Sequence, residues 1–460
     1  MGKAGIKERT RTGVSLPGTK RFTLIALIAV YLAAFIWSWV YWGILLSLLT
    51  LAAVALSLPY TGRSTRYMCL GLFAAGFYLI LSSGGGWQPM LQAMEKNTAL
   101  LVLIITVPLL GVPLRYGGYV EALDALAARH MRTRHQMYWV PALFSHALGV
   151  FMNIGALPLA HEITARGKLS GHPGLLAKSL SRGFGAAMVW SPNMIATATV
   201  LELLKVPWQS YFHQGLMVAF CILLTGYLVD LWGKEWRLAG AGPGPGGECP
   251  YLDRIKLLQL MLASFAFFAI VLLVEMNTSY PVIRTLPLLA LAFPAAWLLL
   301  LGKKEFITAG YADYLLNKVN KHDGEVVLFA AAGFFTAALA FSGWSGKLSQ
   351  YLMLFTSDSR FSAALIIMLA IMISSQVGIH PMVMASAFAT SVDPQSIGFT
   401  PVQMALVLTS SWALGANAAP LSGTCLVVGG VTGRPPHEVA YANILHVLLV
   451  SSLVLLYVSF

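Results

Sequence analysis

Long runs of apolar residues, separated by glycine, proline and short charged segments, make up most of the chain. A helix needs about 20 mainly apolar residues to cross the roughly 30 Å of hydrocarbon in a bilayer. The runs predict about eleven crossings, at residues 22–37, 43–58, 67–83, 100–114, 184–203, 213–232, 256–274, 285–301, 326–342, 401–430 and 439–458. The pattern therefore predicts an all-α integral membrane protein, with the lipid bilayer as a partner.

Two further apolar stretches, 138–163 and 361–391, are interpreted as re-entrant helical hairpins, which enter and leave the membrane on the same side. Their centres read NIGALP and QVGIHP, so an amide, a glycine and a proline interrupt each stretch. Glycine reaches backbone angles that other residues avoid, so we expect Gly155 and Gly378 to form the two turns. The proline of each motif suits the first turn of the returning helix, where no N–H donor is needed.

The distribution of basic residues supports this topology. With both hairpins re-entrant, 25 of the 30 Lys and Arg residues lie on segments assigned to the cytoplasm, in agreement with the positive-inside rule. The N-terminus, with a basic tail at 1–21, is then cytoplasmic and the C-terminus lies outside. We expect a multi-pass protein of the plasma membrane, which in bacteria is the inner membrane. Because topology accounts for the net charge of +12, we expect no binding to nucleic acid.

Composition excludes other classes of protein. Charged residues form 10% of the chain, against about a quarter in soluble domains, so no soluble catalytic domain is left over. Cys69, Cys221, Cys249 and Cys425 are too widely spaced to predict a disulfide framework or a metal cluster. The sequence contains no nucleotide-binding glycine loop and no metal-ligand spacing. We therefore expect no enzyme activity and no cofactor, except for possible sodium ions.

The chain contains an internal repeat. Asn153, Gly155 and Pro158 recur as Gln376, Gly378 and Pro381 at a constant offset of 223. A stretch rich in glycine and proline at 233–255, predicted to be a cytoplasmic linker, separates two halves at 22–232 and 256–460. Five crossings lie between equivalent points of the two halves. Because this number is odd, the halves are predicted to be inverted-topology repeats.

Each half also contains an interrupted crossing. In the first, at 184–203, Pro192 removes a backbone donor and disfavours helical geometry at Ser191. In the second, at 401–430, we expect Gly415, Pro420 and Gly423 to break the helix. Inverted repeats with broken helices are typical of secondary transporters, in which half-helix ends and unwound backbone bind an ion or an anionic substrate.

The two hairpin tips and the two breaks form the predicted site for substrate and ions. Amides donate to carboxylates through their NH2 groups and accept through their oxygens, and helix N-termini attract anions. The candidate residues are Asn153, Gly155, Ser191, Pro192, Asn193, Thr197, Ser375, Gln376, Gly378, His380, Asn417, Pro420, Ser422 and Thr424. Sodium sites are expected near Asn153 and Asn193, and near Gln376 and Asn417.

The coupling ion is left open between sodium and protons. No Asp or Glu lies in the middle of a predicted crossing, because Glu162, Glu202 and Asp230 fall near predicted ends, so a carboxylate proton relay is not favoured. His380 lies at the second tip, where an imidazole either binds substrate or titrates near neutral pH, or else bonds to a neighbouring carbonyl group. His146 is a second histidine within an apolar stretch. Sodium, which needs no titrating group, is slightly preferred.

Re-entrant hairpins with amide-bearing tips, each followed by a broken helix, resemble the ion transporter superfamily, which includes divalent anion/sodium symporters, citrate carriers and arsenite permeases. The resemblance covers most of residues 60–458. In the symporters each tip carries Ser-Asn-Thr, which contacts substrate carboxylates and forms sodium sites. Here the tips read Met152-Asn153-Ile154 and Ser375-Gln376-Val377, so only the amide and one serine are kept. The resemblance implies a homodimer that moves a small anionic solute by an elevator-type motion.

Three functions are compatible with these features. The first, which we favour, is secondary active transport of a small carboxylate-like organic anion, coupled to sodium or protons. The second is that of a membrane subunit in a multicomponent anion transporter, or of a permease for an inorganic oxyanion. The third is a membrane enzyme acting on lipid-linked substrates. That third function calls for a cluster of catalytic carboxylates or histidines, and no such cluster is evident in the sequence.

Overall fold

The computed structural model describes residues 16–131, 133–165, 171–233, 252–278, 280–344 and 359–460, together with 346, 347, 350, 351 and 354. These residues form helices and contain no strand, which confirms the predicted all-α class. The α-helices are α1 (Leu16–Ile36), α2 (Trp42–Ser57), α3 (Arg63–Ser82), α4 (Trp87–Glu95), α5 (Thr98–Thr106), α6 (Val112–Tyr116), α7 (Tyr119–His130), α8 (Arg134–Met152), α9 (Ala156–Thr164), α10 (Pro173–Met188), α11 (Ile195–Leu204), α12 (Trp208–Leu231), α14 (Arg254–Asn277), α15 (Val282–Leu300), α16 (Glu305–Asp313), α17 (Asp323–Phe341), α19 (Arg360–Gln376), α20 (Pro381–Ser391), α21 (Pro401–Ala418), α22 (Gly423–Thr432), α23 (Pro436–Tyr441) and α24 (Ile444–Ser459). Short 3-10 segments are η1 (Leu58–Tyr60), η2 (Val107–Gly111), η3 (Asn153–Gly155), η6 (Val319–Lys321) and η7 (Pro394–Ile397), and η5 (Tyr314–Lys318) is a π-helical turn.

Ten helical segments within the described residues are long and apolar enough to cross a membrane. Nine of them match predicted crossings, and the tenth, Arg134–Thr164, contains the first predicted hairpin. The predicted crossing at 184–203 is not among the ten, because α10 already begins at Pro173 and the helix is interrupted before α11. The crossing at 439–458 also differs, since the short α23 precedes an α24 of 16 residues. The chain is a multi-pass helical membrane protein.

Two predicted segments lie largely outside the described residues. The basic tail at 1–21 is one of them, although α1 begins at Leu16 and so includes its last residues. The glycine- and proline-rich linker at 233–255 is the other, and Cys249 lies within it. The remaining three cysteines are free.

Each predicted hairpin consists of two helices that contact each other across a tight turn, α8 with α9 and α19 with α20. At the first tip, Asn153 rather than Gly155 has a positive φ, 52° with ψ of −141°, against −62° for Gly155. A residue with a side chain rarely adopts this combination of φ and ψ, and Asn153 Oδ1 accepts a local hydrogen bond from the backbone N–H of Ile154 at 2.8 Å. Gly155 lies in the turn, within η3, but the expectation that it supplies the unusual backbone angle is wrong. At the second tip Gly378 has φ of 87°, as predicted, and Pro381 is the first residue of α20.

Both broken helices are present. The first is interrupted between Met188 and Ile195, and the second between Ala418 and Gly423. Gly415 lies inside α21, so its predicted role in the break is wrong. A Cβ atom at that position would lie 3.2 Å from Ser375 Oγ, so the glycine serves the close packing of α21 against α19.

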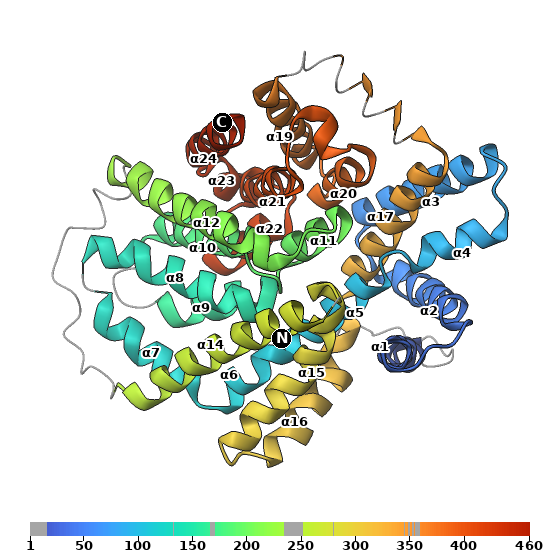
Figure 1. Cartoon of the computed structure of the whole chain (residues 1–460). Helices are drawn as coiled ribbons and strands as arrows, with labels where there is room; N and C mark the ends of the chain where they lie inside the picture. The colour runs from blue at the N-terminus through green and yellow to red at the C-terminus, as the bar shows by residue number, and fades with distance from the viewer. Residues whose placement is uncertain are drawn as a thin grey trace, which may run out of the picture.

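The helices form two units. We call α8–α12 with α19–α24 the hairpin unit, and α1–α7 with α14–α17 the supporting unit. In Figure 1 the hairpin unit occupies the upper and left part of the molecule, with α21 and α22 near its centre, while α1–α5 and α17 lie on the right and α14–α16 at the bottom. α3 and α17 pack closely in the supporting unit, where a Cβ on Gly76 would lie only 2.7 Å from the Phe334 ring.

The two halves of the hairpin unit make matched contacts. In the first half α10 packs on α8 and α12, and in the second half α21 packs on α19 and α24. Between the halves, α11 contacts α20 and α21, while α22 contacts α9 and α10. The helix that follows each break therefore reaches the hairpin and the broken helix of the other half.

Candidate functional site

The first break is partly closed by its own side chains. Thr197 Oγ1 donates to the carbonyl oxygen of Met188 at 2.7 Å, so this predicted ligand group instead bridges the break. Asn193 Nδ2 donates to the carbonyl oxygen of Val150, in α8, at 3.0 Å. Asn193 Oδ1 and Ser191 Oγ, by contrast, are buried and have no hydrogen-bond partner among the described residues. Buried polar atoms are nearly always bonded, so two open oxygens beside Pro192 indicate a place for a ligand.

The second break is bridged in the same way. Ser422 Oγ donates to the carbonyl oxygen of Ala416 at 2.5 Å and accepts from the backbone N–H of Cys425 at 3.1 Å. This hydroxyl closes the gap around Pro420 and caps α22, so its own hydrogen-bonding capacity is used within the fold. Thr424 is buried in the first turn of α22.

Asn417 is the most exceptional side chain of the second break. It is fully buried, and neither Oδ1 nor Nδ2 has a partner in the described part of the chain. Its amide lies against α10, where a Cβ on Gly185 would come within 2.3 Å of Nδ2. The second break thus packs directly on the first broken helix. An unpaired buried polar group costs about 1–3 kcal/mol, so Asn417 is placed for a function other than packing.

The side-chain amides of Asn153 and Gln376, at the two hairpin tips, differ in which of their atoms is not hydrogen-bonded. Asn153 Oδ1 accepts from the backbone N–H of Ile154 at 2.8 Å, which leaves its NH2 group to donate. Gln376 Nε2 donates to the carbonyl oxygen of Ala418 at 3.0 Å, which leaves its Oε1 oxygen to accept. An amide nitrogen does not accept and a carbonyl oxygen does not donate, so both assignments follow from the partners.

The other predicted groups of the second tip have mixed roles. Ser375 Oγ donates to the carbonyl oxygen of Ile371 within its own helix at 2.6 Å. His380 caps α20, because its Nδ1 accepts from the backbone N–H of Met382 at 3.2 Å. The bond places the ring proton on Nε2, and the ring packs edge-on against Trp412 with 5.5 Å between centroids. The expected carbonyl partner of His380 is replaced by this backbone N–H.

A cavity of about 500 Å³ opens beside the first tip, and we call it the tip cavity. Asn153, Ile154 and Gly155 line it together with Ile195, the first residue of α11. Its far wall comes from the supporting unit and carries Arg115, Asp313, Lys318, Lys321, His322 and Glu325. Burial lowers the pKa of His322, and the carboxylates of Glu325 and Asp323 oppose that shift.

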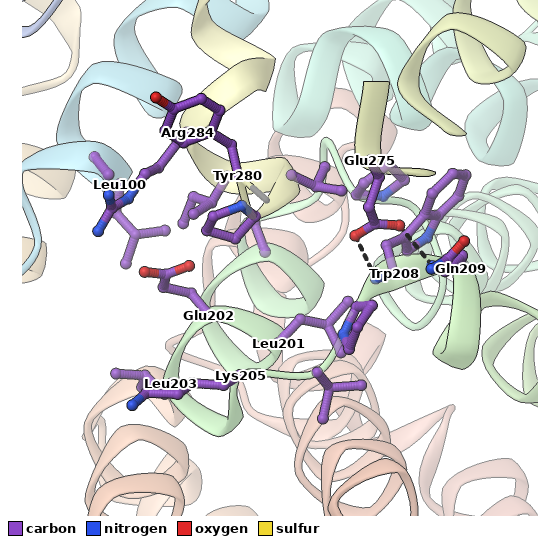
Figure 2. Close-up of a pocket in the computed structure, with 18 of the residues that line it drawn as sticks. Leu100, Leu201, Glu202, Leu203, Lys205, Trp208, Gln209, Glu275, Tyr280 and Arg284 are labelled. Atoms are coloured by element: carbon purple, nitrogen blue, oxygen red, sulfur yellow. Dashed lines mark hydrogen bonds between the residues drawn. The ribbon is translucent and has the colours of Figure 1, made fainter. Parts of the chain in front are cut away.

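A second cavity of about 570 Å³, which we call the Arg284 cavity, lies between α11, α14 and α15 and is shown in Figure 2. Arg284, Lys96, Lys205 and Glu202 contribute its charges. On its other side Glu275 accepts from the backbone N–H groups of Trp208 at 2.7 Å and Gln209 at 2.8 Å, which ties α14 to the start of α12.

The two cavities lie at opposite ends of the same helices. Along α5, Leu100 lines the Arg284 cavity, whereas Ile104 lines the tip cavity. At the first break, Pro192 lines the Arg284 cavity and Ile195 the tip cavity. The broken segment is thus accessible from two separate cavities.

Sequence reasoning missed a buried charged cluster in the hairpin unit. Lys178 and Arg182 of α10 both pair with Asp230 of α12, at 2.5 Å and 2.9 Å. The sequence places Asp230 near a predicted helix end and Lys178 and Arg182 on a predicted cytoplasmic segment. The sequence did contain one indication of this cluster. Lys178 and Arg182 are four residues apart in a helix whose other residues are mostly small or apolar, and this spacing places both cations on one face.

Two further histidines have structural partners. His146 Nε2 accepts from Trp190 Nε1 at 3.3 Å, and His446 Nε2 donates to the carbonyl oxygen of Ile222 at 2.9 Å. Among the described residues, no three His, Cys, Asp or Glu side chains are grouped as metal ligands would be.

Comparison with known proteins places the fold. Together, the helices and broken segments define a multi-pass helical membrane protein, and its fold is similar to that of one solved transporter structure. The crystal structure of the Alcanivorax borkumensis YdaH transporter, described as having an unusual topology, matches 81% of this chain and 87% of its own, with a TM-score of 0.58 and 16% sequence identity. No protein-family model and no curated protein matches the chain. At this identity the likeness is one of fold.

Proposed function

We propose that the protein is a secondary active transporter of a small, carboxylate-like organic anion. The observation that carries the proposal is Asn417, a fully buried amide with no partner in the described chain, placed where two broken helices meet. An apolar residue of similar size would avoid the cost of burying this amide. A solute that bonds to Asn417 during transport supplies the missing partner.

The chemistry around Asn417 favours an anion. The first turns of α11 and α22 follow the two breaks, and the N-terminal end of a helix carries a partial positive charge. Asn153 lines the tip cavity, and its NH2 group is left to donate. Carboxylates bind such donor sets through their oxygens.

Coupling to sodium is preferred over coupling to protons. Asn193 Oδ1 and Ser191 Oγ are unpartnered oxygens at the first break, and Gln376 Oε1 is left free at the second tip. Oxygen ligands of this kind suit a hard cation. The proposed sodium sites therefore lie near Asn153 and Asn193, and near Gln376 and Asn417.

We also propose that transport uses an elevator-type motion of the hairpin unit against the supporting unit. The matched contacts of the two halves support an arrangement as inverted repeats, and the two cavities at opposite ends of α5 and α11 suit alternating access. The proposal includes a homodimer in the bacterial inner membrane, with the N-terminus in the cytoplasm and the C-terminus outside.

The test is uptake by the purified protein alone, reconstituted in liposomes. We expect labelled carboxylates to accumulate when an inward sodium gradient is present and to stop accumulating when sodium is replaced by choline. Uptake driven by a proton gradient instead would show that protons are the coupling ion, and the proposal of a secondary transporter would still hold. Uptake that requires an added protein would favour the multicomponent alternative, and preference for sulfate or arsenite over carboxylates would favour an oxyanion permease. No transport of any anion would refute the proposal.

A further inference from the structure

A third cavity adjoins the Arg284 cavity, and we call it the Tyr31 cavity. It has a volume of about 470 Å³ and is lined by residues of α1, α2, α4, α11 and α15. The two cavities share Lys96, Ala99, Glu202 and Arg284, so they meet at these residues. A volume of this size is usual for a ligand pocket, since most measure about 300–1,000 Å³.

Four charged side chains line the Tyr31 cavity without pairing with one another. They are the carboxylates of Glu95 and Glu202 and the cations of Lys96 and Arg284. Arg284 interacts electrostatically with both carboxylates, yet in the described part of the chain none of the four forms an ion pair or a side-chain hydrogen bond. Figure 2 shows Arg284 and Glu202 on one side of the Arg284 cavity, with no hydrogen bond drawn between them.

A hydroxyl group in the same cavity points to a ligand as well. Tyr31 lines the cavity, and its hydroxyl oxygen is buried and has no hydrogen-bond partner among the described residues. Buried polar groups are nearly always bonded. The open hydroxyl and the unpaired charges therefore indicate a place for a polar, charged molecule.

The charges of the Tyr31 cavity select the kind of ligand. Two carboxylates stand against two cations, so a simple anion would meet two like charges and so would a simple cation. A zwitterion offers each group an opposite charge. Burial also orders the charges, because Lys96 and Arg284 are exposed whereas Glu95 and Glu202 are half-buried. The ligand should therefore insert its positive group first and keep its negative group nearer the mouth.

The Tyr31 cavity lies beside an aromatic belt. Trp42 lines the cavity, and the segment before it, which connects α1 and α2, exposes Trp37, Trp39 and Tyr41. Trp and Tyr side chains gather at the depth of the lipid headgroups in membrane proteins. The cavity is thus at the level at which the headgroup of a neighbouring lipid is found.

We propose that the Tyr31 cavity binds the headgroup of an aminophospholipid such as phosphatidylethanolamine. In this lipid the ammonium group is at the free end, and the phosphate group joins it to the glycerol and the two acyl chains. The ammonium group then reaches Glu95 and Glu202, to which it donates hydrogen bonds. The phosphate group stays with Lys96 and Arg284, as in other headgroup sites between membrane helices, and the chains remain in the bilayer. The Tyr31 hydroxyl donates to a phosphate oxygen.

A lipid bound in this way contacts both units of the protein. Glu202 belongs to α11 of the hairpin unit, whereas Tyr31, Glu95 and Arg284 belong to the supporting unit. A ligand stabilises the arrangement to which it binds best. The lipid therefore favours the relative position of the two units described here. This role is separate from transport and does not depend on the identity of the solute.

The experiment titrates the purified protein in detergent with four probes and measures their binding by native mass spectrometry. The probes are the dioleoyl forms of phosphatidylethanolamine, phosphatidylcholine and phosphatidylglycerol, and soluble glycerophosphoethanolamine. We expect phosphatidylethanolamine to bind about fivefold more tightly than the other two lipids, the effect of one partly exposed ion pair. Phosphatidylcholine has no N–H group to donate, and phosphatidylglycerol has no positive charge.

Two variants locate the site. Glu95→Gln and Glu202→Gln each remove one partner of the ammonium group and leave the cavity with a positive surplus. Each should weaken phosphatidylethanolamine binding about fivefold and strengthen phosphatidylglycerol binding about fivefold, so that the preference reverses. Either variant suffices if the other does not fold. Glu305→Gln is the matched control, because Glu305 is an exposed glutamate that follows the other end of α15, and it should leave all affinities unchanged.

The outcomes separate a headgroup site from other kinds of lipid contact. Equal affinities of the wild-type protein for the three lipids would overturn the proposal, because no headgroup would then be recognised. An unchanged preference in both glutamine variants would also overturn it. Displacement of phosphatidylethanolamine by an equal concentration of glycerophosphoethanolamine would show that the ligand is a soluble zwitterion and not a lipid. None of these measurements involves transport, so the transporter proposal is tested separately.

Discussion

Replacing Asn417 by alanine should abolish binding without weakening the fold. In the described chain both amide atoms of Asn417 are buried and unpaired, and each such atom costs about 1–3 kcal/mol. Truncation removes this cost and leaves a small cavity, which costs about 1 kcal/mol in return. The free energy of unfolding of the ligand-free variant is therefore expected to equal or exceed that of the wild type.

Asn443 is the matched control for Asn417. It is an equally buried amide in the same unit, but it contacts Arg182 Nε, Ser181 Oγ and the carbonyl oxygens of Asn417 and Val439. Asn443→Ala leaves Arg182 Nε without an acceptor, although Asp230 still pairs with the guanidinium, so it should cost about 1.5–3 kcal/mol. The two substitutions remove the same atoms, so their difference isolates the effect of hydrogen-bond partners.

The assay is thermal unfolding of the purified variants, with and without a transported carboxylate, followed by uptake in liposomes. We expect Asn417→Ala to unfold at or above the wild-type temperature, to show no ligand-induced increase, and to transport nothing. Asn443→Ala should unfold at a clearly lower temperature. If Asn417→Ala lowers the unfolding temperature as much as Asn443→Ala does, the amide has a structural role and the reasoning is refuted. Normal uptake by Asn417→Ala would remove this residue from the site.

Three further predictions test other parts of the structure. Thr133→Cys and Ala165→Cys flank the first hairpin, and in a background without native cysteines both should react with a membrane-impermeant thiol reagent added on the same side. Lys205→Cys should react from the opposite side. Labelling of residues 133 and 165 from different sides would exclude a re-entrant hairpin. His380→Gln and His446→Gln should both leave the pH dependence of uptake near neutrality unchanged, because His380 Nδ1 already accepts from the backbone N–H of Met382 and the His446 ring is bonded to a carbonyl group of α12. Loss of the pH dependence in His380→Gln alone would identify this histidine as the proton-sensing group and refute this prediction. Glu275→Gln should lower the free energy of unfolding by about 1–2 kcal/mol, measured by thermal unfolding. The carboxylate accepts hydrogen bonds from two backbone N–H groups, and an amide has only one oxygen to accept them. Glu305→Gln, at an exposed position, should have no effect.

The sequence allowed the architecture to be predicted because its signals are local. Apolar length predicts the helices, and Pro192 and Pro420 mark where two of them are interrupted. The unusual backbone angle of the first tip was expected at Gly155, the residue that adopts such angles most readily, but it occurs at Asn153, so residue type alone did not locate it. Gly415 was misread for a related reason, because glycine within a membrane helix serves close packing as often as it breaks a helix.

The candidate site was harder to predict because it depends on contacts between distant segments. Thr197 and Ser422 were expected to face a ligand, but each bonds to a backbone carbonyl across its own break. Asp230 lies 48 residues from Arg182, so no local pattern indicates that they form a pair. The unpaired state of Asn417 follows only from the packing of α21 on α10. Residue type predicted where polar groups occur, and the three-dimensional arrangement decides which of them remain free.

The unequal hairpin tips give the binding space a chemical polarity. Asn153 presents hydrogens and Gln376 presents an oxygen, although the two residues occupy corresponding positions in the repeat. Under the proposed function, a carboxylate therefore has one favourable orientation relative to the sodium ion at the second tip, with its oxygens toward Asn153 and that ion toward Gln376. The sodium ion proposed at the first break would be bound by Asn193 Oδ1 and Ser191 Oγ and not by the NH2 group of Asn153. The reverse orientation sets oxygen against oxygen at one tip and metal against hydrogen at the other. In the proposed transporter, two similar halves would thus distinguish the two ends of the solute, because Asn153 is bonded through its oxygen to the backbone of Ile154 and Gln376 through its nitrogen to the backbone of Ala418.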